Sequence, residues 1–191
     1  SYCDHGHDHI GNNRGMENHP IIGFNYRISE LHAAVGAAQT RKVPTIRATN
    51  LKNKAFLQKE LSKVAGIGFS KLGDDNGDSG TFLNILMPDT ETAKRTVDEF
   101  NKAGVIGFNY WFTNMYHFIN QWEHIKGLKT ASKLPIQVLG APQDYNNLHL
   151  PKTQDVVGRL ISFGIRCTWT EEELKNLAAK ISECATKALK P

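Results

Sequence analysis

The sequence predicts an α/β protein in which a small sheet is covered by helices. Short apolar runs bounded by glycine or proline predict strands, and they alternate with stretches whose apolar residues recur at helical spacing. With 40% hydrophobic and 22% charged residues, the composition is that of an ordinary globular protein. The length of 191 residues suits one compact domain, or one domain with an appended piece.

Residues 1–27 come first and are rich in Gly, His, Asn and Asp. They carry little periodic apolar pattern, so we expect an irregular segment that needs something else to fold against. A helical pair follows. Ser29 can cap a first helix that extends to about Arg41, and Pro44 can occupy the first turn of a second helix that ends before Gly66. The apolar faces of the two helices comprise Ile28, Leu31, Val35 and Ala38, and then Leu57, Leu61 and Val64.

The pattern that follows is strand, helix, strand, long connection, strand and helix. Residues 81–87 (TFLNILM) are short and apolar, which predicts a buried strand, and Asp89 can cap a helix that ends at Gly104. Residues 105–112 (VIGFNYWF) predict a second strand. The aromatic-rich residues 113–126 predict a segment that is helical in part.

The long connection contains Pro135, Pro142 and Pro151. Residues 159–167 (RLISFGIRC) predict a third strand, and Thr170 with Glu173 forms a capping-box pattern that begins the last helix. We expect a hinge near residues 43–45. Residues 1–42 would then belong spatially to another domain, and residues 43–191 would form a small α/β domain.

Charge and composition exclude several classes of protein. The formal net charge is only +4 and no basic block is present, so we expect no nucleic-acid partner. No run approaches the roughly 18 apolar residues that span a bilayer, and the polar N-terminus is unlike a signal peptide. We therefore expect a cytoplasmic protein without a membrane partner. Its three widely spaced cysteines favour reduced thiols.

Alternating histidines near the N-terminus are the first candidate site. His5, His7 and His9 are flanked by Asp4 and Asp8, and imidazoles and carboxylates are ligands of zinc and nickel. In an extended chain, however, only neighbouring histidines share an ion easily, and no further ligand pair follows at helical spacing. We expect a solvated loop with no bound metal. A non-catalytic metal- or ligand-binding module that uses these histidines stays open as an alternative.

A possible phosphate cradle, GFNYR at residues 23–27, directly precedes the helix that begins near Ser29. Unpaired backbone N–H groups and the helix dipole favour an anion at such a position. Asn25 and Arg27 add side-chain donors. The same pattern is also typical of an ordinary helix start, so the motif alone leaves both interpretations open.

Aromatic residues crowd the region after residue 105. They comprise Phe108, Tyr110, Trp111, Phe112, Tyr116, His117, Phe118 and Trp122. Most aromatic clusters belong to a core. Here hydrogen-bonding groups interleave with the rings, among them Asn114 and His117, and such a surface suits a polar ligand such as a sugar. Both interpretations stay open for individual residues.

The segment DHG at residues 4–6, followed by GFNYRISELHAAVGAAQ at residues 23–39, resembles the pyridoxal-phosphate-dependent sugar aminotransferases of the DegT/StrS family. The resemblance implies a homodimer of fold-type I subunits. Residues 1–42 would be the end of the large cofactor domain with a dimer-contact segment, and residues 43–191 the small C-terminal domain. In the family, the asparagine of GxNxR reaches the cofactor phosphate of the partner subunit. This role is implied for Asn25, with Arg27 beside it.

Residues 109–128 (NYWFTNMYHFINQWEHIKGL) depart from the common family pattern of tyrosine, proline, leucine and histidine. With residues 158–174 (GRLISFGIRCTWTEEEL), they look like the branch that forms 8-amino-3,8-dideoxy-manno-octulosonate, a lipopolysaccharide sugar. That branch aminates a free octulosonate aldehyde with glutamate. A nucleotide-sugar aminotransferase of the same family is the alternative. The implied substrate-binding residues are Tyr110, Trp111, Asn114 and His117, with Arg159 for the substrate carboxylates.

The family's Schiff-base lysine lies upstream of the DHG segment, whereas the first lysine here is Lys42. The resemblance therefore implies that this lysine lies upstream of Ser1. We expect the 191-residue chain alone to be inactive.

Overall fold

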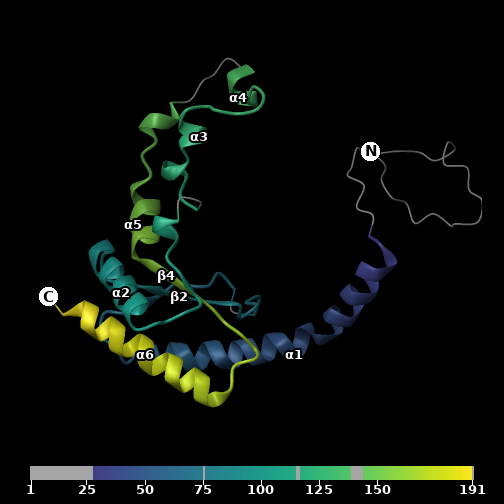
Figure 1. Cartoon of the computed structure of the whole chain (residues 1–191), viewed down its shortest axis with the longest axis vertical. Coiled ribbons are helices and arrows are strands. Elements are labelled where there is room, and N and C mark those ends of the chain that lie inside the picture. Colours follow the sequence, from purple (N-terminus) through teal and green to yellow (C-terminus); the bar gives the residue numbers. More distant parts are fainter. Residues whose placement is uncertain (1–27, 75, 115–116, 139–143, 191) are drawn as a thin grey trace, which may run out of the picture. The chain divides into compact units, whose positions relative to one another are not determined.

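A computed structural model describes residues 28–74, 76–114, 117–138 and 144–190. The chain forms two compact units, residues 1–44 and 45–191 (Figure 1). The elements are, in order, α1 (Glu30–Leu61), β1 (Gly68–Phe69), β2 (Phe82–Leu86), α2 (Thr90–Lys102), β3 (Phe108–Asn109), η2 (Trp111–Thr113), η3 (Ile119–Gln121), α3 (Glu123–Lys126), α4 (Pro135–Val138), η4 (Tyr145–Asn147), α5 (Pro151–Arg159), β4 (Leu160–Gly164) and α6 (Glu171–Leu189). The assignment of residues 1–42 to a cofactor domain stays a prediction.

Helix α1 is continuous where the sequence analysis expects two helices. The Ser29 hydroxyl accepts a hydrogen bond from the backbone N–H of His32 at 3.3 Å, which confirms it as the cap. Pro44 lies inside the helix and not in the first turn of a second one. Proline has no N–H to donate to the carbonyl of Thr40, so one helical hydrogen bond is lost there. The helical turns before and after Pro44 are nevertheless intact. The expected break between two helices is therefore wrong, and α1 is one helix that lacks a single hydrogen bond.

The four strands form one antiparallel sheet in the order β1-β2-β4-β3. In the centre of the sheet, Ser162 of β4 lies opposite Asn84 of β2 on one side and opposite Asn109 of β3 on the other. Because paired residues of antiparallel strands point to the same face, these three polar side chains form a row across one face.

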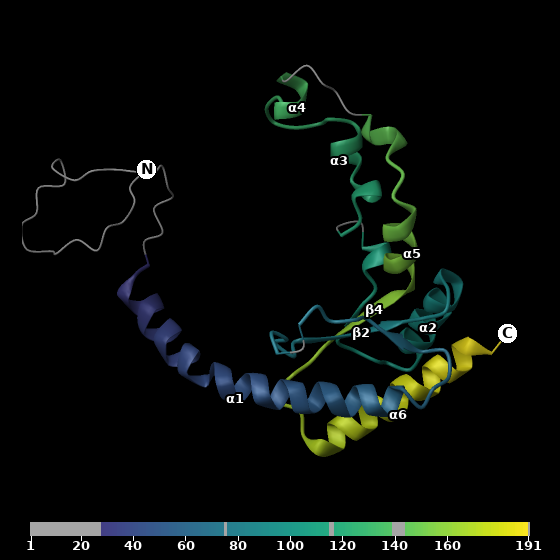
Figure 2. The same ribbon diagram turned by 180° about the vertical axis from the view of Figure 1, so that it is seen from behind.

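The opposite face of the sheet carries the hydrophobic core. Leu83 of β2 pairs with Phe163 of β4, and both are buried. The Phe100 ring of α2 makes edge contacts with Phe163 and with Phe108, at centroid distances of 5.6 and 5.2 Å. Helices α1, α2 and α6 all contribute to the same cluster. Figure 2 shows α6 running beside the second half of α1. The fully buried members include Leu57, Leu61, Leu83, Ile85, Met87, Ala93, Phe100, Ile161 and Ile181.

Two predicted helix starts are confirmed. The Asp89 carboxylate accepts from the backbone N–H of Thr92 at 2.7 Å and begins α2. Thr170 and Glu173 form a complete capping box at the start of α6. Both helices can therefore begin with satisfied N–H groups at the places that the sequence indicates.

The second and third predicted strands are shorter than expected. Gly107 adopts a φ of +81°, so the extended conformation of β3 begins only at Phe108, and η2 follows from Trp111. The strand predicted over residues 159–167 is reduced to β4, because Arg159 is the last residue of α5. That helix was not predicted. Its start at Pro151 uses proline in the first turn, where a missing N–H costs nothing.

Candidate functional site

Several predicted site residues lie outside the part of the chain that the structure describes. They are Asn25 and Arg27 of the phosphate cradle and the histidines His5, His7 and His9. Within the described residues, no group of His, Cys, Asp and Glu is placed to hold a metal ion. The described helices include none that is long and apolar enough to cross a membrane. Because Asn25 and Arg27 lie outside the described residues, their roles stay predictions.

Tyr110 is a core residue, and both its ring and its hydroxyl group make contacts inside the protein. The ring belongs to the hydrophobic cluster, and the hydroxyl donates a 2.7 Å hydrogen bond to the backbone carbonyl of Gly158. Burial raises the pKa of this phenol to about 12. In this structure the hydroxyl joins β3 to the end of α5, and its predicted contact with substrate stays untested.

The structure brings together Trp111, Asn114 and His117. The rings of Trp111 and His117 lie 4.1 Å apart between centroids. The side chains of Asn114 and His117 are hydrogen-bonded at 2.9 Å. The Trp111 indole N–H donates to the Ser162 hydroxyl at 2.9 Å, which fixes the orientation of the indole against the sheet.

Two residues that the sequence analysis did not select, Ser162 and Asn84, extend this group. The Ser162 hydroxyl accepts from Trp111 and donates to the Asn84 side-chain oxygen at 2.6 Å. Each is the polar residue at the centre of an otherwise apolar strand, LISFG or FLNIL. That interruption is a usable signal in the sequence. Their pairing depends on strand register and could not be read from it.

Arg159 makes mainly structural contacts. Its guanidinium forms an ion pair with Asp155, one turn earlier in α5, at 2.9 Å and donates to the backbone carbonyl of Met87 at 3.3 Å. About a quarter of the side chain stays exposed, so the guanidinium is held at the junction of α5 and β2 with one side open to solvent. Its predicted role toward substrate carboxylates is untested.

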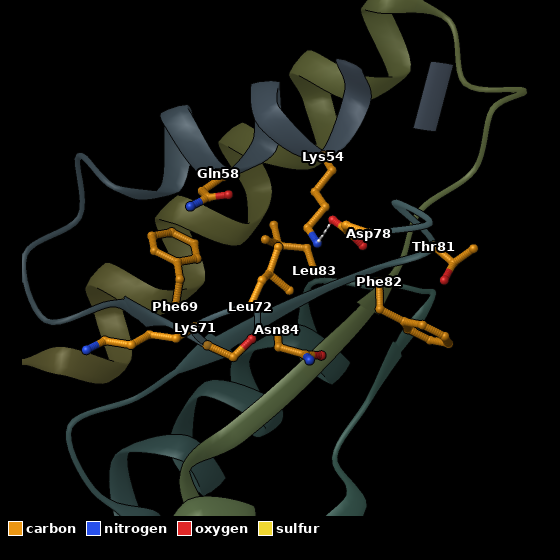
Figure 3. Close-up of a pocket in the computed structure, with 11 residues that line it drawn as sticks. Lys54, Gln58, Phe69, Lys71, Leu72, Asp78, Thr81, Phe82, Leu83 and Asn84 are labelled. Atoms are coloured by element: carbon orange, nitrogen blue, oxygen red, sulfur yellow. Dashed lines mark hydrogen bonds and ion pairs between the residues drawn. The ribbon is translucent and has the colours of Figure 1, made fainter. Parts of the chain in front are cut away.

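A pocket of about 710 Å³ lies between α1 and the edge of the sheet beyond the short strand β1. Figure 3 shows Gln58 and Lys54 on α1 above β2, with Phe82 and Asn84 on the side of β2 away from Leu83. Phe69 and Leu72 complete its apolar lining. This volume is typical of small-molecule sites.

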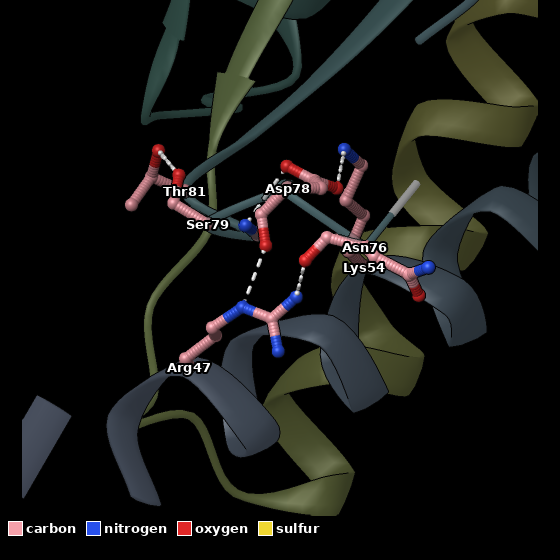
Figure 4. Close-up of polar contacts among 7 residues, drawn as sticks. Arg47, Lys54, Asn76, Asp78, Ser79 and Thr81 are labelled. Carbon is pink, nitrogen blue, oxygen red and sulfur yellow. Dashed lines mark hydrogen bonds and ion pairs between the residues drawn. The ribbon is translucent and has the colours of Figure 1, made fainter. Parts of the chain in front are cut away.

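One wall of the pocket is held by charge. Lys54 of α1 forms an ion pair with Asp78 at 2.6 Å, and both side chains are largely buried. Arg47 donates to the backbone carbonyls of Asp78 and Asn76, at 2.8 and 2.6 Å (Figure 4). The hydrogen bonds from the Lys54 ammonium and the Gly80 N–H lower the pKa of Asp78. These contacts fasten the loop before β2 to α1.

The fold is similar to that of solved aminotransferases. It matches Helicobacter pylori PseC, an aminotransferase of pseudoaminic acid biosynthesis, with a TM-score of 0.61 and 16% identity over 93% of this chain and 43% of that one. For 3-amino-5-hydroxybenzoic acid synthase the TM-score is 0.60 at 20% identity, over 92% and 43%. For the aminotransferase TlmJ from Streptoalloteichus hindustanus it is 0.56 at 13%, over 81% and 36%. The predicted α/β fold class, part of a fold-type I aminotransferase, is confirmed.

The chain spans 36–43% of the length of these structures. The family match also covers nearly all of this chain. Residues 1–182 match the DegT/DnrJ/EryC1/StrS aminotransferase family, from the histidine-rich start through most of α6. This match includes the GxNxR segment, the first compact unit and most of the second, and the chain belongs to the DegT/DnrJ/EryC1/StrS aminotransferase family.

Proposed function

We propose that this chain is part of a pyridoxal-phosphate-dependent enzyme that transfers an amino group from glutamate to the carbonyl carbon of a sugar. The observation that carries the proposal is the family match over residues 1–182, which includes GFNYR at residues 23–27. The enzyme is a homodimer that works in the cytoplasm.

The chemistry of the donors at residues 23–27 fits the cofactor. The amide of Asn25 and the guanidinium of Arg27 are hydrogen-bond donors of the kind that bind phosphate. We assign to Asn25 a hydrogen bond to the phosphate held by the partner subunit. Pyridoxal phosphate, when bound, supplies the electron sink for moving an amino group between two substrates.

Lys54 does not serve the cofactor in this proposal, because its ammonium is paired with Asp78. Following the family pattern, the Schiff-base lysine belongs to the longer protein. The 191-residue chain alone is expected not to transaminate.

The sugar is the free aldehyde that yields 8-amino-3,8-dideoxy-manno-octulosonate, for lipopolysaccharide. The grouping of Trp111, Asn114 and His117 supports a sugar-facing role, because an aromatic ring beside amide and imidazole donors suits a polyol. Arg159, with one side exposed, would pair with the carboxylate of the octulosonate or of glutamate.

The test uses the longer parent enzyme loaded with pyridoxal phosphate. The two half-reactions are followed separately, with glutamate as donor and either the free octulosonate aldehyde or a nucleotide-linked ketosugar as acceptor. We expect turnover with the free aldehyde. Turnover with the nucleotide-linked sugar alone would move the proposal to the other substrate class of the same family.

Metal binding is measured on the same protein. Stoichiometric zinc or nickel without a cofactor absorbance band would overturn the aminotransferase proposal in favour of a metal-binding module at His5, His7 and His9.

Arg159→Lys is expected to raise the KM for carboxylated substrates more than tenfold, because lysine cannot form the planar bidentate pair. An unchanged KM would leave Arg159 with its structural contacts only.

A further inference from the structure

The face of the sheet opposite the core carries a row of polar side chains. Strand pairing does not require polar residues there, because the strands pair through their backbones. Asn84, Ser162 and Asn109 are neighbours across three strands. Ser162 is almost completely buried, at 3% exposure, although it does not point into the core. A buried hydroxyl in the middle of a sheet is stable only when its hydrogen bonds are made.

The bonds of Ser162 have a definite direction. The Trp111 indole can only donate, so the Ser162 oxygen accepts from it, and the single Ser162 proton is left for the Asn84 oxygen at 2.6 Å. In the structure the Asn84 side-chain oxygen faces Ser162 and accepts this proton. The NH₂ group of Asn84 must point away from Ser162.

This NH₂ group has no hydrogen-bond partner among the residues that the structure describes. Asn84 lines the 710 Å³ pocket together with Phe82, a residue that is 48% exposed. Figure 3 shows both side chains on the same side of β2. Residues two apart on a strand share a face, so the oriented donor and the exposed ring lie side by side.

Trp111 lies on the other side of the Ser162 hydroxyl. One hydroxyl group separates its indole from the Asn84 amide, although Trp111 itself is not among the residues that line the pocket. The surface thus combines two aromatic side chains with an amide donor whose direction is set by a buried bond. Aromatic surface with a few fixed polar groups is the usual composition of a small-molecule site.

We propose that this face of the sheet binds a polyhydroxylated sugar ring, with the Asn84 amide donating to a sugar hydroxyl and Ser162 acting as the positioning residue that orients both Asn84 and Trp111. The identification of the sugar as the amino acceptor rests on the proposed function. The binding of a sugar at this face does not.

The decisive variant is Asn84→Asp in the longer enzyme. A carboxylate keeps the acceptor for the Ser162 hydroxyl and nearly the same shape, but it lacks the NH₂ donor. We expect the KM of the sugar half-reaction to rise at least tenfold, with the glutamate half-reaction and the melting temperature unchanged. Asn176→Asp, the same chemical change on an exposed position of α6, is the matched control and should leave both half-reactions as they are.

Ser162→Ala tests the positioning role. It should raise the sugar KM and shift the fluorescence of Trp111, because the indole loses its acceptor. Equal damage to both half-reactions by Asn84→Asp, or damage to neither, would overturn the sugar site. An unchanged sugar KM in Ser162→Ala would overturn the positioning role.

Direct binding separates failure of this site from failure of the proposed function. Saturation-transfer NMR of the longer enzyme uses 3-deoxy-manno-octulosonate and its neutral methyl ester, which removes charge repulsion by the new carboxylate as an explanation. If no carbonyl sugar is aminated, the proposed function fails, and this measurement alone decides the site. A signal lost in Asn84→Asp with both probes supports it, whereas equal signals in the two proteins overturn it.

Discussion

Removing the charge of Asp78 is expected to loosen the loop that borders the pocket. One carboxylate oxygen accepts from the Lys54 ammonium at 2.6 Å, and the other accepts from the backbone N–H of Gly80 at 3.0 Å. The two side chains are only 11% and 13% exposed. Asp78→Asn keeps the size of the side chain and one acceptor. It leaves the Lys54 ammonium largely buried without its counter-ion.

The expected loss follows from that burial. A hydrogen bond to a charged group is worth about 1.5–3 kcal/mol, and breaking a fully buried pair costs roughly 3–5 kcal/mol. Because both groups here keep some contact with water, we expect the free energy of unfolding to fall by about 2 kcal/mol at pH 7. Urea denaturation followed by circular dichroism measures it. Glu91→Gln, which breaks the exposed ion pair to Lys94, is the control and should change little.

The pH dependence gives an independent check. The pKa of Asp78 is lowered from its usual value near 3.8 by the hydrogen bonds from Lys54 and Gly80. A carboxyl group whose pKa is depressed by folding stabilises the fold above its unfolded pKa, and this contribution disappears as the pH falls through the folded pKa. The difference between wild type and Asp78→Asn should be full near neutral pH and shrink below pH 3.8. A difference that is absent at pH 7, or constant down to pH 3, would refute the ion-pair reasoning.

Two further predictions follow from single contacts in the structure, and a third follows from the proposed role of Asn25. Gly80→Ala should cost about 2 kcal/mol or more in urea denaturation, because φ is +71° and the new Cβ would lie 2.9 Å from the Leu51 backbone nitrogen; wild-type stability would contradict this. Tyr110→Phe should cost about 1–2 kcal/mol by leaving the Gly158 carbonyl unpaired, and ultraviolet titration should lose the tyrosine that ionises near pH 12. Asn25→Ala in the longer enzyme should weaken cofactor retention about ten- to a hundredfold. In mixed dimers only the partner's site should suffer, and loss at the altered subunit's own site would exclude the cross-interface role.

The parts of the fold that could be predicted are those that a few neighbouring residues determine. Asp89 and the pair Thr170 and Glu173 satisfy orphan N–H groups within one turn, so their helix starts could be recognised from the sequence. The central strand β2 was likewise recognisable, because its apolar run is short and bounded by Gly80 and Pro88.

The helix break that the sequence predicts in α1 is wrong. The sequence pattern predicts Pro44 in the first turn of a second helix, but α1 continues through it, because a proline inside a helix removes only one of its backbone hydrogen bonds. The apolar pattern of the first half of α1 predicts a shared helix face, and two members of that face, Leu31 and Val35, are 81% and 61% exposed in the structure. Periodicity indicates which side chains would share a face. It does not identify what covers that face.

The candidate site could be predicted only in part, for a reason that lies in strand register. The grouping of Trp111, Asn114 and His117 could be anticipated because these residues lie close together in the sequence. Ser162 is 51 positions from Trp111 and 78 from Asn84, and it meets both only because β4 pairs with β2 and β3 in this register. A shift of one residue would turn Ser162 into the core and Phe163 out of it. The apolar residues on either side of Ser162 therefore set the register by their burial, and the same register places the Asn84 amide against the Ser162 hydroxyl.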